Sequence, residues 1–145
     1  MAETQEQRNK RIYLETVERV WNRGDVASAR EGLAVDYQRH DPAVRAPRGL
    51  YSMVEIIDSF RAAISDLHYE VHDLIAEGDK LAARWTITGR HSGTLFGAGP
   101  TQKDIRVSGQ SFNRFADGKI VEGWLNWDVH GLLEQLGQVA PLAPL

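Results

Sequence analysis

The feature that most constrains the fold is the stretch from Gly109 to Asp128, in which two runs of alternating apolar and polar residues flank Asp117-Gly118. An Asp-Gly pair between two such runs predicts a tight β-hairpin, because both residues tolerate the positive φ angles that the turn requires. Side chains alternate along each arm. On the second arm, one face carries Val121, Gly123, Leu125 and Trp127, and the other carries Glu122, Trp124, Asn126 and Asp128. On the first arm, phased in the same way, one face carries Ser111, Asn113 and Phe115, and the other carries Gln110, Phe112 and Arg114. Both faces carry polar residues, so alternation leaves open which one is buried.

Helical periodicity dominates the chain before residue 67. Apolar residues recur at helical spacing from Thr4 to about Arg23, where Gly24 predicts the end of the helix, and a short helix follows to about residue 32. A strand is expected over 35–41. The pair Ser52 and Glu55 has the spacing of a capping box, which predicts a helix from residue 52 to about residue 67.

Strand periodicity takes over after this helix. Strands are predicted over 68–77 and 80–91, joined by a turn at Gly78-Asp79, and the hairpin arm begins near Lys103. The loop 92–102 carries three glycines and one proline, and it is long enough to form a rim or lid. A short closing helix is expected over 131–137.

Helices gathered first and antiparallel strands gathered last indicate an α+β fold. We expect about three helices against the concave side of a curved, mostly antiparallel sheet of about four to six strands. The 145 residues suffice for one domain with a substantial core, so residues 1–145 are predicted as a single domain. Residues 138–145, QVAPLAPL, are predicted as a loose tail or a strap across an interface.

Composition excludes several classes of partner and chemistry. The net charge is −3 with the signs interspersed, which argues against nucleic acid and membrane partners. Cysteine is absent, which removes thiolate nucleophiles and Cys-ligated metals. No signal peptide or long apolar run occurs, so a cytoplasmic location is expected. His68 and His72 would lie about 13 Å apart on a strand, and no dinucleotide fingerprint is present, so we predict neither a metal nor a cofactor.

A series of short segments in one order resembles the SnoaL-like polyketide cyclases over nearly the whole chain. The matching segments are Val20-Trp21-Asn22-Arg23-Gly24-Asp25, Asp36-Tyr37 with His40-Asp41-Pro42, Ala76-Glu77-Gly78-Asp79, Arg84-Trp85-Thr86, Gly89 with His91, Gly93, Gly97 and Pro100-Thr101, Asp117-Gly118-Lys119-Ile120-Val121-Glu122, Trp124, and Gly131-Leu132-Leu133 with Gln135-Leu136-Gly137. This family belongs to the NTF2-like superfamily, which also contains ketosteroid isomerase and scytalone dehydratase. The resemblance implies an α+β cone around an apolar cavity, and a homodimer.

The chain departs from the family pattern at the positions expected to carry catalysis. The resemblance implies a catalytic Asp directly after the aromatic residue that matches Trp124, commonly with His before that residue. Those two positions hold Leu125 and Gly123, and a second family His matches Ser111. Either the catalytic groups have moved, or the chemistry differs.

Ring closure by aldol addition needs a base, donors to the developing oxyanion and a dry pocket. His91 lies in phase with the apolar face of its strand, where it would titrate near neutrality, although a strand-end His bonded to backbone fits equally well. Asp128 could supply a carboxylate, or it could cap the following helix. His40, next to Asp41, is the reserve candidate. By elimination we predict His91 and Asp128 as acid/base groups, with Ser111 and Asn113 as oxyanion donors.

The predicted cavity takes its lining from the buried phases of several elements, and substrate contacts are assigned to Trp21, Tyr37, Phe60, Trp85, Ser111, Asn113, Leu125 and Trp127. Two functions are open: a cofactor-independent cyclase or isomerase acting on an apolar, polyketide-like or polycyclic molecule, or a non-catalytic protein that binds such a molecule or oligomerises. Trp124, on a polar face, supports the expected homodimer.

Overall fold

A five-stranded sheet with the strand order β1-β5-β4-β3-β2 forms the frame of the structure. The computed structural model describes all residues from 1 to 145. The strands are β1 (Leu33–His40), β2 (Ile64–Glu77), β3 (Lys80–His91), β4 (Asp104–Ala116) and β5 (Lys119–Trp127). β1 runs parallel to β5, and the other neighbours pair antiparallel. The predicted α+β fold with a curved, mostly antiparallel sheet is confirmed.

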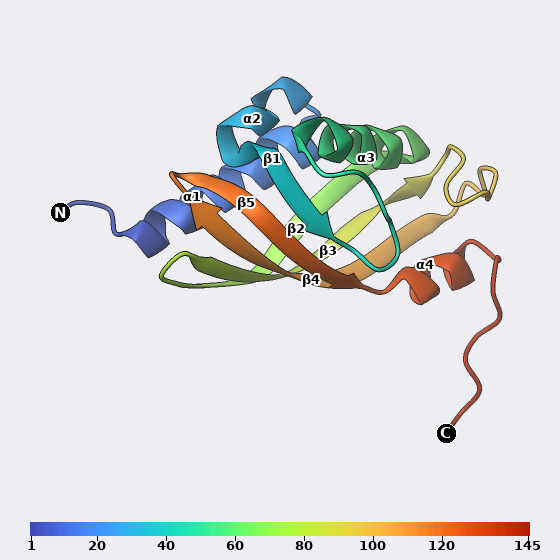
Figure 1. The fold of residues 1–145 in the computed structure, drawn as a ribbon. Helices are drawn as coiled ribbons and strands as arrows, with labels where there is room; N and C mark the ends of the chain where they lie inside the picture. Colours follow the sequence, from blue (N-terminus) through green and yellow to red (C-terminus); the bar gives the residue numbers. More distant parts are fainter.

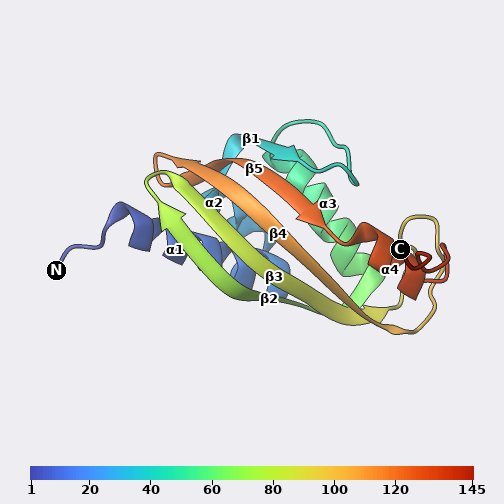
Figure 2. The ribbon, with the colours of Figure 1, turned by 90° about the horizontal axis from the view of Figure 1, so that it is seen from below.

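The first three α-helices lie on one face of the sheet, the last lies at the end of the sheet beyond the last strand, and the other face is left uncovered (Figures 1 and 2). The helices are α1 (Gln5–Thr16), which continues as the π-helix η1 (Val17–Asn22), then the 3-10 turn η2 (Val26–Ser28), α2 (Ala29–Gly32), α3 (Leu50–Ala63) and α4 (Val129–Gln135). The structure therefore has four α-helices, whereas about three were expected. None of them has the length and apolar character needed to span a bilayer.

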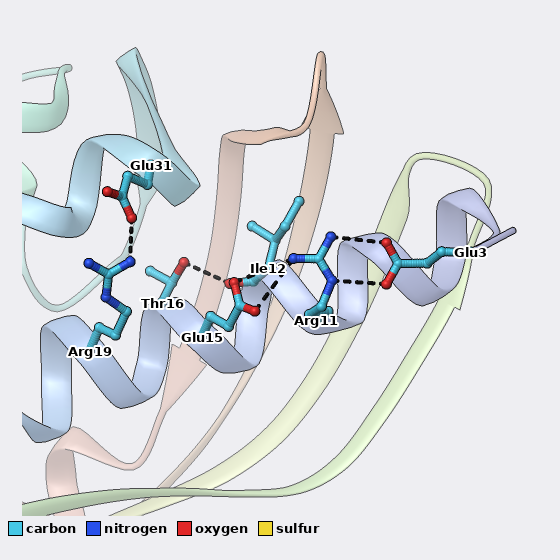
Figure 3. Close-up of polar contacts among 7 residues, drawn as sticks. All are labelled: Glu3, Arg11, Ile12, Glu15, Thr16, Arg19 and Glu31. Carbon is cyan, nitrogen blue, oxygen red and sulfur yellow. Dashed lines mark hydrogen bonds and ion pairs between the residues drawn. The ribbon is translucent and has the colours of Figure 1, made fainter.

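The surface of α1 carries ion pairs, whereas its buried side faces the sheet. Arg11 pairs with Glu3 at 2.9 Å and with Glu15 at 3.4 Å, and Arg19 in η1 pairs with Glu31 in α2 (Figure 3). These side chains are exposed, so solvent screens the pairs and they contribute little to stability. Burial of the opposite side, which carries Tyr13, therefore fixes the position of α1 on the sheet.

The helix α3 differs from its prediction at both ends. It begins at Leu50 after Gly49 and has no side-chain cap, so the capping box predicted at Ser52 is wrong. It ends at Ala63 rather than near residue 67, because β2 already begins at Ile64 and pairs along the full length of β3. The apolar residues between Ile64 and Leu67 have helical spacing in the sequence. In the structure they belong to β2, whose backbone N–H and C=O groups form hydrogen bonds with β3.

The last hairpin forms where predicted, but a register shift at Val121 places Ile120, not Val121, in the buried position opposite Phe115. The structure also decides which face of the hairpin is buried. Asp117 and Gly118 have φ angles of 51° and 75°, as a tight hairpin turn requires. Ser111 and Asn113 are buried on the face covered by the helices. Phe112 and Trp124 lie on the uncovered face with 44% and 38% of their surface exposed. The face that carries Leu125 and Trp127 is therefore the inner one.

Candidate active site and ligand cavity

A mostly apolar cavity lies between the concave face of the sheet and the helices. It is lined by 21 residues, 17 of them hydrophobic, and the space open to the centre of a water molecule is about 90 Å³. All eight residues assigned to substrate contact from the sequence line it: Trp21, Tyr37, Phe60, Trp85, Ser111, Asn113, Leu125 and Trp127. That they bind a substrate stays a prediction.

Aromatic rings form much of the cavity wall. Trp21, at the end of η1, lies with its ring centroid 5.5 Å from that of Tyr69, and Tyr69 lies 5.1 Å from Trp85. The ring of Trp85 rests directly on the backbone of β4 at Gly109, where a Cβ atom would come within 2.5 Å of the ring and within 2.8 Å of the Trp127 Cβ. Glycine at this position therefore allows the two tryptophans to shape one wall.

Hydroxyl groups cluster on the sheet side of the cavity. The Tyr13 hydroxyl lies 3.0 Å from the Tyr69 hydroxyl and 3.2 Å from Ser111 Oγ, and Asn113 Nδ2 donates to that Oγ at 3.3 Å. Burial raises the pKa of Tyr13 and of Tyr69 above the ordinary value. Burial also raises the pKa of Tyr37 to about 12, although the nearby Arg39 charge opposes this shift. At neutral pH these phenols are hydrogen-bond donors, not bases.

Arg39 is the only charged residue in the cavity lining. It shares a strand face with Tyr37, two residues earlier in β1, and its side chain is only 10% exposed. Its Nη1 lies 2.8 Å from Asp41 Oδ2 in a buried ion pair, and its Nε has no hydrogen-bond acceptor in the protein. The guanidinium therefore keeps an N–H group, on Nε, that the protein does not use.

Asp41 holds two residues of the cavity wall in place. Its side chain is completely buried, and it accepts hydrogen bonds from Trp127 Nε1 at 3.0 and 3.1 Å and from the Ala43 backbone N at 2.9 Å. Its negative charge also balances Arg39. In the sequence, Asp41 stands out only as the neighbour of His40 and within the family-like segment His40-Asp41-Pro42, and Arg39 does not stand out. The signal that could have identified Arg39 is its spacing of two residues from Tyr37 on a strand, which places both side chains on the same face.

None of the three predicted acid/base residues lines the cavity, and the structure does not bring them together. His91 is fully buried, and its Nδ1 accepts a hydrogen bond from the Thr101 backbone N at 3.1 Å, which places the ring proton on Nε2. Asp128 is exposed and caps α4 by accepting from the Gly131 backbone N at 2.8 Å. The catalytic roles of His91 and Asp128 stay predictions.

His40 lies on the uncovered face of the sheet. Its Nε2 is 2.7 Å from Glu122, and its ring stacks on Trp124 at 5.2 Å. His40 and Asp41 therefore point to opposite sides, as alternation along a strand predicts. The catalytic role of His40 also stays a prediction. No group of three or more His, Asp or Glu side chains lies close enough together to hold a metal ion.

Comparisons with known proteins agree with this architecture. The family model described as SnoaL-like polyketide cyclase matches residues 11–136. TsrD from Streptomyces laurentii is 29% identical, with a TM-score of 0.82 over 90% of this chain and 96% of its own. A proposed polyketide cyclase from Acidithiobacillus ferrooxidans is 26% identical, with a TM-score of 0.83 over 94% of this chain and 99% of its own.

A third similar structure carries a different functional description. AclR from Streptomyces galilaeus, a proposed hydroxylase, is 30% identical, with a TM-score of 0.81 over 93% of this chain and 88% of its own. A search of curated protein sequences finds no match. The fold is thus shared by structures whose descriptions name more than one reaction.

Proposed function

Because this chain belongs to the SnoaL-like polyketide cyclase family, we propose that it holds a small, largely apolar, polyketide-like molecule in its cavity and promotes ring closure or isomerisation without a cofactor. The observation that carries this proposal is Arg39, a buried guanidinium with an unused Nε–H group in a mostly apolar wall. Such a group favours a ligand that presents a carbonyl or an anionic oxygen to it.

The chemistry follows from where negative charge develops. In an aldol ring closure, a carbon next to a carbonyl loses a proton to a water molecule that enters with the ligand, because the cavity wall supplies no base, and the charge of the resulting enolate gathers on the carbonyl oxygen. The enolate carbon then bonds to a second carbonyl carbon, whose oxygen becomes an alkoxide and takes up a proton. A positive charge fixed in a dry cavity stabilises these oxyanions far more than water would. Arg39 is placed for this role, and Asp41 is a positioning residue behind it.

The remaining polar groups of the wall act as neutral donors in this proposal. The hydroxyl groups of Tyr37 and Tyr13 keep their protons at neutral pH, because burial raises the pKa of both. They can donate to a ligand oxygen but cannot remove a proton. The apolar walls would hold a reactive chain in one folded conformer, and such positioning alone can account for a large part of a rate enhancement.

Binding without turnover is the second candidate function. The cavity wall contains no carboxylate and no imidazole, and Leu125 and Ser111 occupy positions where the family resemblance implied catalytic Asp and His. A protein that only binds an apolar, oxygen-bearing molecule needs neither group. The acid/base roles predicted for His91, Asp128 and His40 would require the ligand to reach beyond this wall.

A matched pair of quinones tests the binding step. 2-Hydroxy-1,4-naphthoquinone is an anion near neutral pH, whereas its 2-methoxy analogue is neutral and of similar shape. Binding of either should quench the fluorescence of Trp21, Trp85 and Trp127, which line the cavity. The chain has no cysteine, so the quinones cannot add to a thiol. A hydrogen bond to a charged group contributes about 1.5–3 kcal/mol, so we expect about 10- to 100-fold tighter binding of the anion.

The variant Arg39→Gln should lose this preference and still bind the neutral quinone. Arg48→Gln is the matched control, because the Arg48 side chain is 59% exposed and does not line the cavity. Equal affinity of the wild type for both quinones would refute the oxyanion site. Turnover is tested separately with a short poly-β-keto ester, whose cyclisation creates aromatic absorbance. Acceleration that depends on Arg39 supports the enzyme, and tight binding without acceleration supports the binding protein.

A further inference from the structure

The loop 92–103 between β3 and β4 is anchored firmly at its base. His91 N donates to Lys103 O at 2.8 Å, Gln102 N donates to His91 O at 2.8 Å, and Gly93 N donates to Ala63 O at 3.0 Å. The last contact fixes the loop beside the end of α3, where both ribbon views show it (Figures 1 and 2). The buried ring of His91 adds a bond to Thr101, so this histidine has a structural task within the loop.

The tip of the loop is a tight turn with an unusual residue in it. Leu95 and Ala98 exchange backbone hydrogen bonds at 3.0 and 2.9 Å, and both are buried. Between them, Phe96 and Gly97 have φ angles of 49° and 77°. A turn with two positive φ angles favours Asn, Asp or Gly at both central positions. A bulky residue in this conformation is strained, and such strain is a reason to look for a function of the side chain.

The Phe96 ring covers the outer side of the cavity wall. Its centroid lies 6.1 Å from that of Trp127 and 6.2 Å from that of Phe60, and these two rings lie 6.0 Å apart. Phe60 and Trp127 line the cavity, whereas Phe96 does not, and 41% of its surface is exposed. Phe96 therefore stands between solvent and the two aromatic residues that close this end of the cavity.

We propose that Phe96 is a gate residue that controls access of ligands to the cavity between Phe60 and Trp127. A ligand passes when the Phe96 ring swings outward, and the ring then closes behind it. This inference rests on the proposed function, because it takes the cavity as the ligand site. The Trp127 ring on which Phe96 packs also reaches the polar end of the cavity, since its Nε1 is hydrogen-bonded to Asp41 and Asp41 is paired with Arg39.

The variant Phe96→Asn tests the gate, because asparagine suits the backbone conformation but cannot cover the wall. Its melting temperature should equal or exceed that of the wild type. In stopped-flow fluorescence, the association and dissociation rate constants of the neutral 2-methoxy-1,4-naphthoquinone should both rise about tenfold, the factor that follows from a barrier lower by about 1.4 kcal/mol. Phe96→Tyr, which keeps the ring, should exchange ligand at the wild-type rate. Unchanged rates in Phe96→Asn would overturn the proposal.

A second measurement needs no ligand and therefore separates the gate from the proposed function. In a Trp124→Phe background, which removes the tryptophan of the uncovered face, acrylamide quenching reports access to the remaining three tryptophans. Phe96→Asn should raise the quenching constant, and Phe96→Tyr should not. If neither the parent protein nor Phe96→Asn binds a quinone, but Phe96→Asn has the higher quenching constant, then the proposed function is refuted and the gate is supported. If the quenching constant is unchanged, the gate fails.

Discussion

The indole Nε1 of Trp127 donates to both carboxylate oxygens of Asp41, at 3.0 and 3.1 Å. These residues end two neighbouring parts of the sheet, because Trp127 is the last residue of β5 and Asp41 follows β1. The same carboxylate lies 2.8 Å from the Arg39 guanidinium. The buried Asp41 carboxylate thus holds both Trp127, an aromatic residue of the cavity wall, and Arg39, the only cation in the cavity lining.

Removing this carboxylate should destabilise the protein strongly. Asp41→Ala leaves Arg39 without its buried counter-ion, and loss of one partner of a buried ion pair costs about 3–5 kcal/mol. The free energy of unfolding in urea gives the measurement. Asp36→Ala serves as control, because the Asp36 side chain is 71% exposed and its pairing distance to Arg48 is 3.9 Å. The control should stay within about 0.5 kcal/mol of the wild type. Equal losses in both variants would contradict a structural role for Asp41.

The buried tyrosines predict a loss of stability at high pH. An unfolded tyrosine has a pKa of about 10, whereas burial raises the pKa of Tyr37 to about 12. Between these values the unfolded chain releases a proton that the folded chain keeps. The contribution is therefore fully present below about pH 10, is lost as the pH rises towards 12, and amounts to about 3 kcal/mol. Tyr13 and Tyr69 act in the same direction.

Urea unfolding between neutral and strongly alkaline pH measures this effect. Tyr37→Phe should show a shallower fall of the unfolding free energy with pH than the wild type. Tyr51, which is 76% exposed, provides the matched control, and Tyr51→Phe should follow the wild-type curve. A Tyr37→Phe curve parallel to that of the wild type would argue against burial as the source of the loss.

Close contact at Gly109 predicts that a single methyl group disturbs the cavity wall. Gly109→Ala would place its Cβ 2.5 Å from the Trp85 ring, and such overpacking costs about 1–3 kcal/mol. Near-ultraviolet circular dichroism should change as well, because Trp85 and Trp127 must move. Gly99→Ala is the control, since a Cβ at Gly99 meets no atom within 4 Å. If Gly109→Ala kept the wild-type spectrum and stability, as Gly99→Ala should, the close contact between Gly109 and Trp85 would not constrain the cavity wall.

The uncovered sheet face supports the predicted homodimer. Ile75, Phe112 and Trp124 are exposed on it by 68%, 44% and 38%, and the rings of Phe112 and Trp124 lie 6.1 Å apart. An apolar patch of this kind favours an interface. Light scattering at micromolar concentration should give twice the mass of one chain, and Trp124→Glu should give the single mass. Leu14→Glu, at an exposed position on α1, should leave the dimer intact. A single mass for the wild type would refute the dimer.

Two substitutions at Asp128 separate a helix cap from a catalytic group. Asp128→Ala should lower stability by about 1 kcal/mol, whereas Asp128→Ser should keep the cap of α4. Once a substrate is identified, Asp128→Ser should turn it over at the wild-type rate if Asp128 only caps. Loss of an acid/base group costs about 100-fold or more. A loss of that size in Asp128→Ser would assign the catalytic role predicted from the sequence.

Local sequence was enough to predict much of the fold. The Asp117-Gly118 turn, the strand β3 from Lys80 to His91 and the end of the first helical segment before Gly24 all follow from periodicity and turn chemistry, which act between residues close in the chain. Alternation also placed His91 on a buried face. The same local reasoning failed at the start of α3, where the spacing of Ser52 and Glu55 fits a capping box that the chain does not use.

Tertiary structure alone decided the polar site. Asp41 and Trp127 are 86 residues apart in sequence, and no periodicity connects them. Arg39 becomes a buried cation with an unused Nε–H group only because β1 lies parallel to β5 and the helices close the cavity above it. The sequence determined which side of a strand a residue occupies only where alternation is unbroken, and register shifts in β2 and β5 break it, so that Ile120 rather than Val121 is buried. Which of those sides faces the cavity depends on burial shared by distant elements, and only the folded chain determines it.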